Sequence, residues 1–190
     1  PNSGVYSACP DDDLFVHVSL SYSDAHPNME QGGFNDGITN GAQWYAIDGG
    51  MQDWNYVWEQ GFDVTLEQSQ TKWPNSSQLS SLWNQHREPL LAYLEQIHNG
   101  LKGLVLDDES GQAVDASIRV NGIEHDISPD PEHGDYYRLL APGTYTITAE
   151  AYGYFPQSTT VYIDDGEATV HDFYMQPMPE EPYLDFVSQD

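Results

Sequence analysis

The sequence predicts an α/β segment followed by an all-β sandwich. Apolar residues recur every three or four positions up to residue 101, whereas from Lys102 onward they alternate with polar residues. Turn dipeptides such as Asn-Gly and Pro-Gly separate the alternating runs. With 38% hydrophobic and 13% aromatic residues among its 190, the chain can bury a core. We therefore expect an α/β segment at residues 1–100, a β-sandwich at 101–178 and an acidic tail at 179–190.

The chain is strongly acidic. Five Lys and Arg residues against 31 Asp and Glu give a net charge of −26, and such a surface repels nucleic-acid phosphates and anionic membranes. It would attract cationic peptides, but it is equally typical of a protein that stays soluble in a salty medium, and we favour that interpretation. No run of about 18 apolar residues occurs, so we expect no membrane span.

The two ends of the chain and its single thiol say little about the compartment. Cys9 is the one cysteine, which excludes an internal disulfide and is neutral on location. The chain begins at Pro1, without Met or a signal peptide, so we expect a processed or truncated product.

The sequence Cys9-Pro10-Asp11-Asp12-Asp13 predicts the start of a helix. Proline and aspartate are favoured in a first turn, where acids complement the helix dipole. The apolar residues that follow are Leu14, Phe15, Val18, Leu20 and Tyr22. The three aspartates therefore suit the start of a helix.

The most informative stretch runs from Gly37 to Glu67. Two glycine turns bracket Tyr45, which we expect to be exposed, and a short aromatic helix and an alternating strand over residues 62–66 follow. A carboxylate at a strand end beside bulky aromatic residues can gain proton affinity and act as a general base. The alternative is that Glu67 is a solvated strand terminus and that the aromatic residues are core: Trp44, Trp54, Tyr56 and Trp58.

An amphipathic helix is expected to close the first segment. Its apolar stripe comprises Leu79, Leu82, Trp83, His86, Leu90, Leu94, Ile97 and Leu101, and Asn99-Gly100 is a typical helix end. Proline is tolerated near a first helical turn, so Pro89 places the start of the continuous helix near Asn84 or Gln85. A histidine beside such a stripe, as His86 is, is more typical of a packed side chain than of a metal ligand.

Six alternating runs predict the strands of the second segment: residues 101–106, 116–120, 136–140, 144–149, 159–163 and 169–175. Hairpin turns at this spacing indicate a small antiparallel sandwich. A loop is expected to gather acids and histidines at residues 124–126 and 130–135. A metal site is conceivable there, but the spacing matches no ligand pattern, and we favour a solvated acidic loop.

The stretch from Gly37 to Glu67 resembles the zinc metallocarboxypeptidases of the regulatory, carboxypeptidase D/E/M/N-like subfamily. The motifs GITNG-x-x-WY and GGMQDWNY carry the resemblance. It implies that Tyr45 is a mobile residue covering bound substrate, that Gln52 lies in the pocket for the C-terminal side chain, and that Thr65 also binds substrate. Glu67 takes the place of the catalytic glutamate that works with the zinc-bound water.

The resemblance extends into the second segment. The sequences KGLVLD and GDYYRLLAPGTYTITAEAYGY resemble the transthyretin-like domain that follows the catalytic domain in this subfamily. The first segment is then the C-terminal part of a carboxypeptidase-like mixed-sheet domain. Relatives in eukaryotes commonly have cysteines where Gly61 and Gln70 stand, and an apolar residue in place of Gln68, which favours a relative without disulfides, as in bacteria.

The zinc ligands of the family are missing from this chain. They form a His-x-x-Glu motif and a histidine before two glycines, and none of the seven histidines fits either pattern. The arginines that hold the substrate's terminal carboxylate are also missing, since Lys72 is the first basic residue. The resemblance implies that the Zn²⁺ ligands and these arginines lie upstream of Pro1.

Two functions from different classes follow. The first is a zinc-dependent metallocarboxypeptidase that removes the C-terminal residue, Lys or Arg by preference, from peptides or proteins. It would require the N-terminal part of the same catalytic domain as a partner, and this chain alone would be inactive. The second is a noncatalytic relative whose β-sandwich mediates binding. Retention of Tyr45 and Glu67 favours the first, because a decayed site has no packing reason to keep both. We expect a secreted or periplasmic location.

Overall fold

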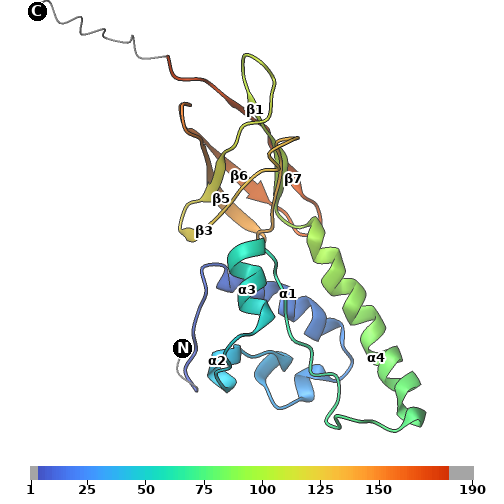
Figure 1. Cartoon of the computed structure of the whole chain (residues 1–190). Coiled ribbons are helices and arrows are strands. Elements are labelled where there is room, and N and C mark those ends of the chain that lie inside the picture. The colour runs from blue at the N-terminus through green and yellow to red at the C-terminus, as the bar shows by residue number, and fades with distance from the viewer. Residues whose placement is uncertain (1–3, 180–190) are drawn as a thin grey trace, which may run out of the picture.

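The computed structural model describes residues 4–179 and is a mixed α/β structure (Figure 1). Helices come first: α1 (Asp12–Ala25), η1 (Met29–Gln31), η2 (Asn35–Gly37), α2 (Gly41–Trp44), α3 (Met51–Glu59), α4 (Ser76–Glu95) and η3 (Gln96–His98). The strands follow: β1 (Leu101–Asp107), β2 (Ser117–Val120), β3 (Ile123–Ile127), β4 (Asp135–Arg138), β5 (Gly143–Glu150), β6 (Gln157–Ile163), β7 (Thr169–Val170) and β8 (Phe173–Met175). We call residues 4–100 the helical part and residues 101–179 the β part. Apart from Pro179, the predicted tail lies outside the described residues.

Helix α1 begins within the aspartate-rich stretch, at Asp12, as predicted. Asp12 and Asp13 occupy its first turn, where negative charge complements the helix N-terminus. Leu14, Val18 and Tyr22 are buried along it. Asp11 precedes the helix, but its side chain makes no cap hydrogen bond, because its carboxylate is bound by other elements.

Helix α4 is longer than the sequence predicts. It begins at Ser76 and continues through Pro89 to Glu95, so a start near Asn84 or Gln85 is wrong. Asn75 provides a capping box: its side chain accepts from Ser77 N at 3.2 Å, and Gln78 Oε1 accepts from Asn75 N at 3.1 Å. This cap satisfies first-turn N–H groups and stabilises the turns before Pro89, which lies buried inside the helix.

The strand predicted at residues 62–66 does not form. Residues 60–69 carry no regular secondary structure, and in the described helical part no strand is present to pair with them. Alternation predicts which residues share a face, but a β-strand exists only where a neighbouring strand fills its backbone hydrogen bonds. The mixed sheet expected for the first segment is thus absent from the described residues 4–100.

The β part consists of two four-stranded sheets. In one, β1 lies between β4 and β7, and β8 also pairs with β1; the other has the order β3-β2-β5-β6. All pairs of the second sheet are antiparallel, whereas β1 runs parallel to β7 and β8, so the expectation of a purely antiparallel arrangement is wrong. The chain crosses from β6 in one sheet to β7 in the other, which permits the parallel pairing. Both sheets contribute to one buried core, which includes Val105, Ile118, Ile147, Ile163 and Phe173.

The sequence pattern did not predict strand β3. Residues Glu124, His125 and Asp126 were expected in a loop but lie on β3, which pairs with β2 across the turn at Asn121-Gly122. Ile127 is buried at 3% exposure, so this short run does alternate between polar and buried residues. The three polar side chains concealed that pattern.

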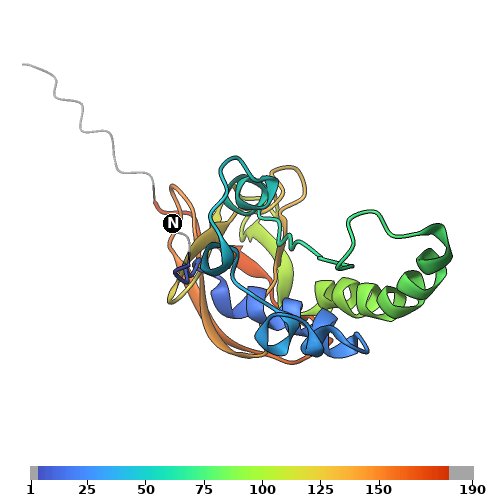
Figure 2. The ribbon, with the colours of Figure 1, turned by 90° about the horizontal axis from the view of Figure 1, so that it is seen from below.

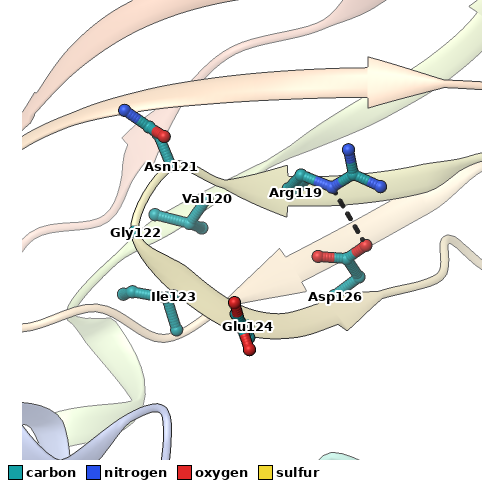
Figure 3. A pocket seen from close by; sticks show the side chains of 7 residues that line it. All are labelled: Arg119, Val120, Asn121, Gly122, Ile123, Glu124 and Asp126. Carbon is teal, nitrogen blue, oxygen red and sulfur yellow. Dashed lines mark hydrogen bonds and ion pairs between the residues drawn. The ribbon is translucent and has the colours of Figure 1, made fainter.

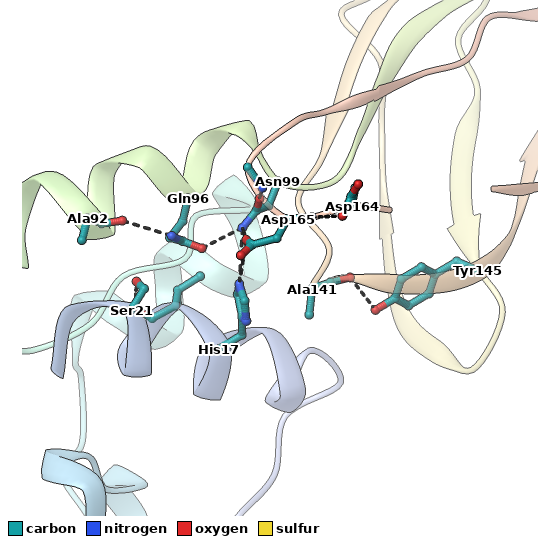
Figure 4. Close-up of polar contacts among 11 residues, drawn as sticks. His17, Ser21, Ala92, Gln96, Asn99, Ala141, Tyr145, Asp164 and Asp165 are labelled. Carbon is teal, nitrogen blue, oxygen red and sulfur yellow. Dashed lines mark hydrogen bonds and ion pairs between the residues drawn. The ribbon is translucent and has the colours of Figure 1, made fainter. Parts of the chain in front are cut away.

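The helical and β parts are joined at two places, one of which surrounds Asn99 (Figure 4). Asn99 is buried; its Oδ1 accepts from Gly166 N at 2.5 Å, and its Nδ2 donates to Gln96 Oε1 at 2.7 Å. His17 of α1 faces Asp165 across the same contact, with 4.0 Å between Nε2 and Oδ1. The second joint is centred on Asp11. By contrast, the first turns of α4 and the connection before them project from the rest of the molecule (Figure 2).

Within the described residues, no helix is both long enough and apolar enough to cross a membrane.

Candidate active site

Tyr45 is presented at the end of a one-turn helix. Asn40 caps α2, with its Oδ1 accepting from Gln43 N at 3.3 Å, and its side chain also exchanges hydrogen bonds with the backbone of Ser7. The chain leaves the helix at Tyr45 in an extended conformation. The Tyr45 ring packs edge-on against Trp44, with 4.7 Å between centroids, and remains 50% exposed, as predicted.

Gln52 and Thr65 are brought into direct contact. Gln52 lies in the first turn of α3, and its Oε1 accepts from Thr65 Oγ1 at 2.7 Å. Its Nε2 donates to Asp63 O at 3.2 Å, and Asn55, one turn later, donates its side-chain amide to the Asp63 carboxylate. These bonds attach the irregular segment after Gly61 to the face of α3. The hydrogen bonds among the described residues do not join Tyr45 or Glu67 to this pair.

Glu67 is exposed, and the backbone just after it is anchored by a buried histidine. His86 Nε2 lies 3.1 Å from Gln68 O, and its Nδ1 lies 2.6 Å from Tyr22 Oη. A carbonyl oxygen only accepts, so Nε2 carries the hydrogen and Nδ1 accepts from the tyrosine hydroxyl. This tautomer holds Gln68 in place and leaves the Glu67 carboxylate open. Burial, and next the nearby His86, lower the pKa of His26, whose ring lies 4.5 Å from that of His86.

The aromatic residues of the stretch are mostly outside the core. Tyr56 is buried at 8% exposure, whereas Trp58 is 70% exposed. The interpretation of all four as core residues is therefore wrong for its three tryptophans, Trp44, Trp54 and Trp58. All five tryptophans of the chain are exposed, the remaining two being Trp73 and Trp83.

The described residues do not offer a catalytic zinc site. One group in this part of the chain could hold a metal ion: Asp130 and His133 in the loop before β4, and Asp135 at the start of that strand. It supplies one histidine, whereas catalytic zinc sites of this kind use two histidines and a carboxylate. Asp130 Oδ1 also accepts from the backbone N–H groups of Glu132 and His133, at 2.9 and 2.8 Å, which lowers its pKa. The cluster is a hydrogen-bonded turn of the β part.

A surface depression lies elsewhere, at the β2–β3 hairpin (Figure 3). Arg119 and Asp126 form an ion pair at its edge, with 3.3 Å between Nε and Oδ2, and Val120 and Ile123 lie beside the turn. Neither Tyr45, Gln52, Thr65 nor Glu67 lines it. The depression is separate from the predicted site residues.

Sequence reasoning missed Arg138, which the structure buries at 1% exposure. It binds Asp11 at 2.7 Å, at the joint between the two parts. The sequence did contain a sign that Arg138 is buried, because Tyr136, Arg138 and Leu140 occupy alternate positions and thus share a face of the strand. All three are buried in the structure. An arginine among inward-facing residues requires a buried anionic partner.

Comparisons with known proteins agree on one family. A family model described as zinc carboxypeptidase matches residues 2–89. The chain is 45% identical to the carboxypeptidase N catalytic chain of Mus musculus, covering 96% of this chain and 41% of that protein. It is 44% identical to carboxypeptidase D of Anas platyrhynchos, covering 95% of this chain and 14% of that protein. The chain thus spans less than half the length of these relatives.

Likeness to solved structures is low. A membrane-associated protein of unknown function from Bacteroides fragilis gives a TM-score of 0.33 at 13% identity, covering 44% of this chain and 29% of that one. A likeness this weak carries no argument.

Proposed function

Because this chain belongs to the zinc carboxypeptidase family, alongside carboxypeptidases N and D, we propose that it is the C-terminal part of a metallocarboxypeptidase catalytic domain followed by a transthyretin-like domain. The reaction is hydrolysis of the C-terminal peptide bond of a peptide or protein. The hydrogen bond between Gln52 and Thr65 is the observation that carries this proposal. It joins two residues that are predicted to bind substrate, and Thr65 lies on the segment that leads to Glu67. The two sheets around one core support the transthyretin-like assignment.

The exposed apolar surface of the helical part supports the proposal that a further segment completes the domain. The large exposed residues from residue 44 to residue 97 are Trp44, Tyr45, Ile47, Met51, Trp54, Val57, Trp58, Trp73, Leu79, Trp83, Leu91, Leu94 and Ile97. Large exposed apolar groups in such number are often the sign of a surface that a partner covers. In the proposed enzyme, the N-terminal part of the catalytic domain covers this surface and supplies the zinc ligands and the arginines.

Each residue of the candidate site has a role in this proposal. Glu67 takes the proton of the attacking water and later returns it to the leaving amine, which a carboxylate can do when it is accessible to substrate. Gln52 hydrogen-bonds the substrate's C-terminal side chain, and Thr65 orients the Gln52 amide. Tyr45 covers the bound substrate from its exposed position. A zinc ion held by ligands outside this chain would supply Lewis-acid chemistry at the scissile carbonyl.

Specificity for basic C-terminal residues is part of the proposal. The amide of Gln52 can hydrogen-bond a long polar side chain, and an acid outside this chain would complete the recognition of Lys or Arg. A secreted or periplasmic location, where peptide C-termini are available as substrates, completes the proposal.

The test compares the chain with a protein that includes the upstream segment. The longer protein should bind about one zinc per site and cleave C-terminal Arg and Lys faster than Phe and Leu, whereas the 190-residue chain should bind zinc weakly and be inactive. Gln52→Leu should reduce the preference for basic residues, and the exposed Gln112→Leu in the β part serves as the control. Tight stoichiometric zinc in the short chain, or an unchanged ranking in Gln52→Leu, contradicts the proposal.

A further inference from the structure

The carboxylate of Asp11 is the centre of the second joint between the helical and β parts. It is fully buried and has three partners from three elements. Arg138 Nη2 donates to Oδ1 at 2.7 Å, and Oδ2 lies 2.9 Å from the Tyr56 hydroxyl and 2.8 Å from His125 Nδ1. A buried charge is tolerated when donors satisfy it in this way, and removal of one partner leaves the others unpaired.

The β part supplies two of these three donors. Arg138 lies at the end of β4 and His125 in the middle of β3, and the Arg138 side chain is fully buried while that of His125 is 12% exposed. A carboxylate oxygen only accepts, so His125 Nδ1 carries the hydrogen. Within the described residues, Asp11 is the one anion that pairs with this buried guanidinium. The Nε atom of Arg138 has no hydrogen-bond partner there, so the guanidinium depends on Asp11 for charge compensation.

Tyr56 transmits this contact to helix α3. Its hydroxyl donates to Asp11 Oδ2 and accepts from Asp11 N at 3.2 Å. Burial, and next the hydrogen bond to Asp11, raise the pKa of Tyr56 far above its ordinary value, so the hydroxyl remains a donor. Tyr56 lies four residues after Gln52 on the same helix and thus on the same face.

The same cluster also holds the segment that carries Thr65. The Phe62 ring lies 5.8 Å from that of Tyr56 and 6.4 Å from that of His125, and His125 packs on Tyr56 at 4.2 Å. Tyr93 of α4 donates to Phe62 O at 2.5 Å. Three residues further on, Thr65 donates to Gln52. The β part therefore contacts both elements whose meeting forms the Gln52–Thr65 pair.

We propose that Arg138 and His125 are positioning residues, through which the β part fixes α3 and residues 62–65 against each other by way of Asp11 and Tyr56. The inference rests on the proposed function in so far as Gln52 and Thr65 bind substrate. It gives the β part a defined role, the support of the substrate-binding pair.

Hydrogen exchange of the 190-residue chain tests this without any enzymatic activity. Tyr56→Phe keeps the ring but removes the hydroxyl, and it should speed exchange in residues 51–65 by about tenfold, the effect of losing one hydrogen bond to a charged group. Exchange in β5 and β6 should stay unchanged. The matched control is Tyr136→Phe, which removes the hydroxyl of another buried tyrosine, one that donates to His171 O inside the β part. It should leave residues 51–65 unaffected.

A second pair of variants tests the contribution of the β part. Arg138→Met should raise the exchange rate of residues 51–65 as much as Tyr56→Phe does. Arg138→Lys should recover most of the protection from exchange, because lysine still offers Asp11 a positive charge. If Arg138→Met unfolds the chain, the exchange rates of Tyr56→Phe and Arg138→Lys in residues 51–65 decide whether the inference holds. Unchanged exchange in residues 51–65, or an equal rise in β5 and β6, overturns the inference. Failure of the longer protein to cleave peptides would contradict the proposed function and leave this result standing.

Discussion

Glu67 and Tyr45 are both exposed, yet the structure places them in different local settings. Glu67 belongs to an irregular segment whose next residue is anchored by His86, so its backbone is held while its carboxylate stays accessible. Tyr45 follows a single helical turn and contacts the ring of Trp44. An accessible carboxylate on an anchored backbone suits proton transfer, and an aromatic side chain on a short turn suits closure over a ligand.

Replacement of Glu67 by Gln should separate catalysis from binding in the protein that includes the upstream segment. Glutamine is nearly the same size but cannot accept and return a proton, so kcat should fall on the order of 10²-fold or more, with little change in KM. Tyr45→Phe should cost much less, because its hydroxyl does not transfer the essential proton. Steady-state kinetics on one basic substrate measure both. A near-normal kcat in Glu67→Gln would place the catalytic base elsewhere.

At the scale of elements, α4 shows that a helix can continue through an internal proline. Pro89 removes one backbone donor inside the helix. The capping box at Asn75 and Gln78 and the burial of His86 and Pro89 hold the first turns in helical form. The cap therefore contributes to the stability of the part of α4 that projects from the molecule.

Asn75→Ala should lower the free energy of unfolding by about 1 kcal/mol, the usual effect of removing an N-cap side chain. Asn28→Ala is the control, since Asn28 precedes η1 without a side-chain cap hydrogen bond. Urea unfolding followed by circular dichroism measures both variants. Equal effects at the two positions would show that the Asn75 cap is not specifically stabilising.

At the scale of the whole molecule, burial is unevenly distributed. The β part has a continuous core, whereas in the helical part the described core residues are few: Leu14, Val18, Tyr22 and Tyr56. Many large apolar side chains of the helical part face outward. This imbalance supports the proposal that a further segment packs against the helical part.

Tryptophan quenching should report the exposure of the helical part directly. All five tryptophans lie in the helical part, with exposed fractions from 47% at Trp44 to 92% at Trp73. Acrylamide is neutral and thus unaffected by the net charge of −26, and it should quench nearly all fluorescence of the 190-residue chain. A fraction should become inaccessible in the protein that includes the upstream segment. Identical quenching in the two proteins would show that this surface remains uncovered.

The sequence by itself determined the elements that local patterns specify. The acid-rich start of α1, the alternation and turn dipeptides of β1, β5 and β6, and the exposure of Tyr45 were all predictable. The motifs that contain Tyr45 and Gln52 carried the resemblance to zinc carboxypeptidases. These features depend on side-chain period, capping and turn chemistry, which act over a few residues.

Tertiary structure alone decided the rest. Residues 62–66 alternate as a strand does but have no neighbour to pair with, so they are held by Gln52 and Tyr93 instead. The partner of Arg138 lies 127 residues away, and nothing local specifies it. Whether the tryptophans are buried depends on which surfaces meet. Backbone pairing, charge compensation and burial depend on residues that are distant in the sequence and that only the fold brings together. A local sequence pattern therefore does not predict them.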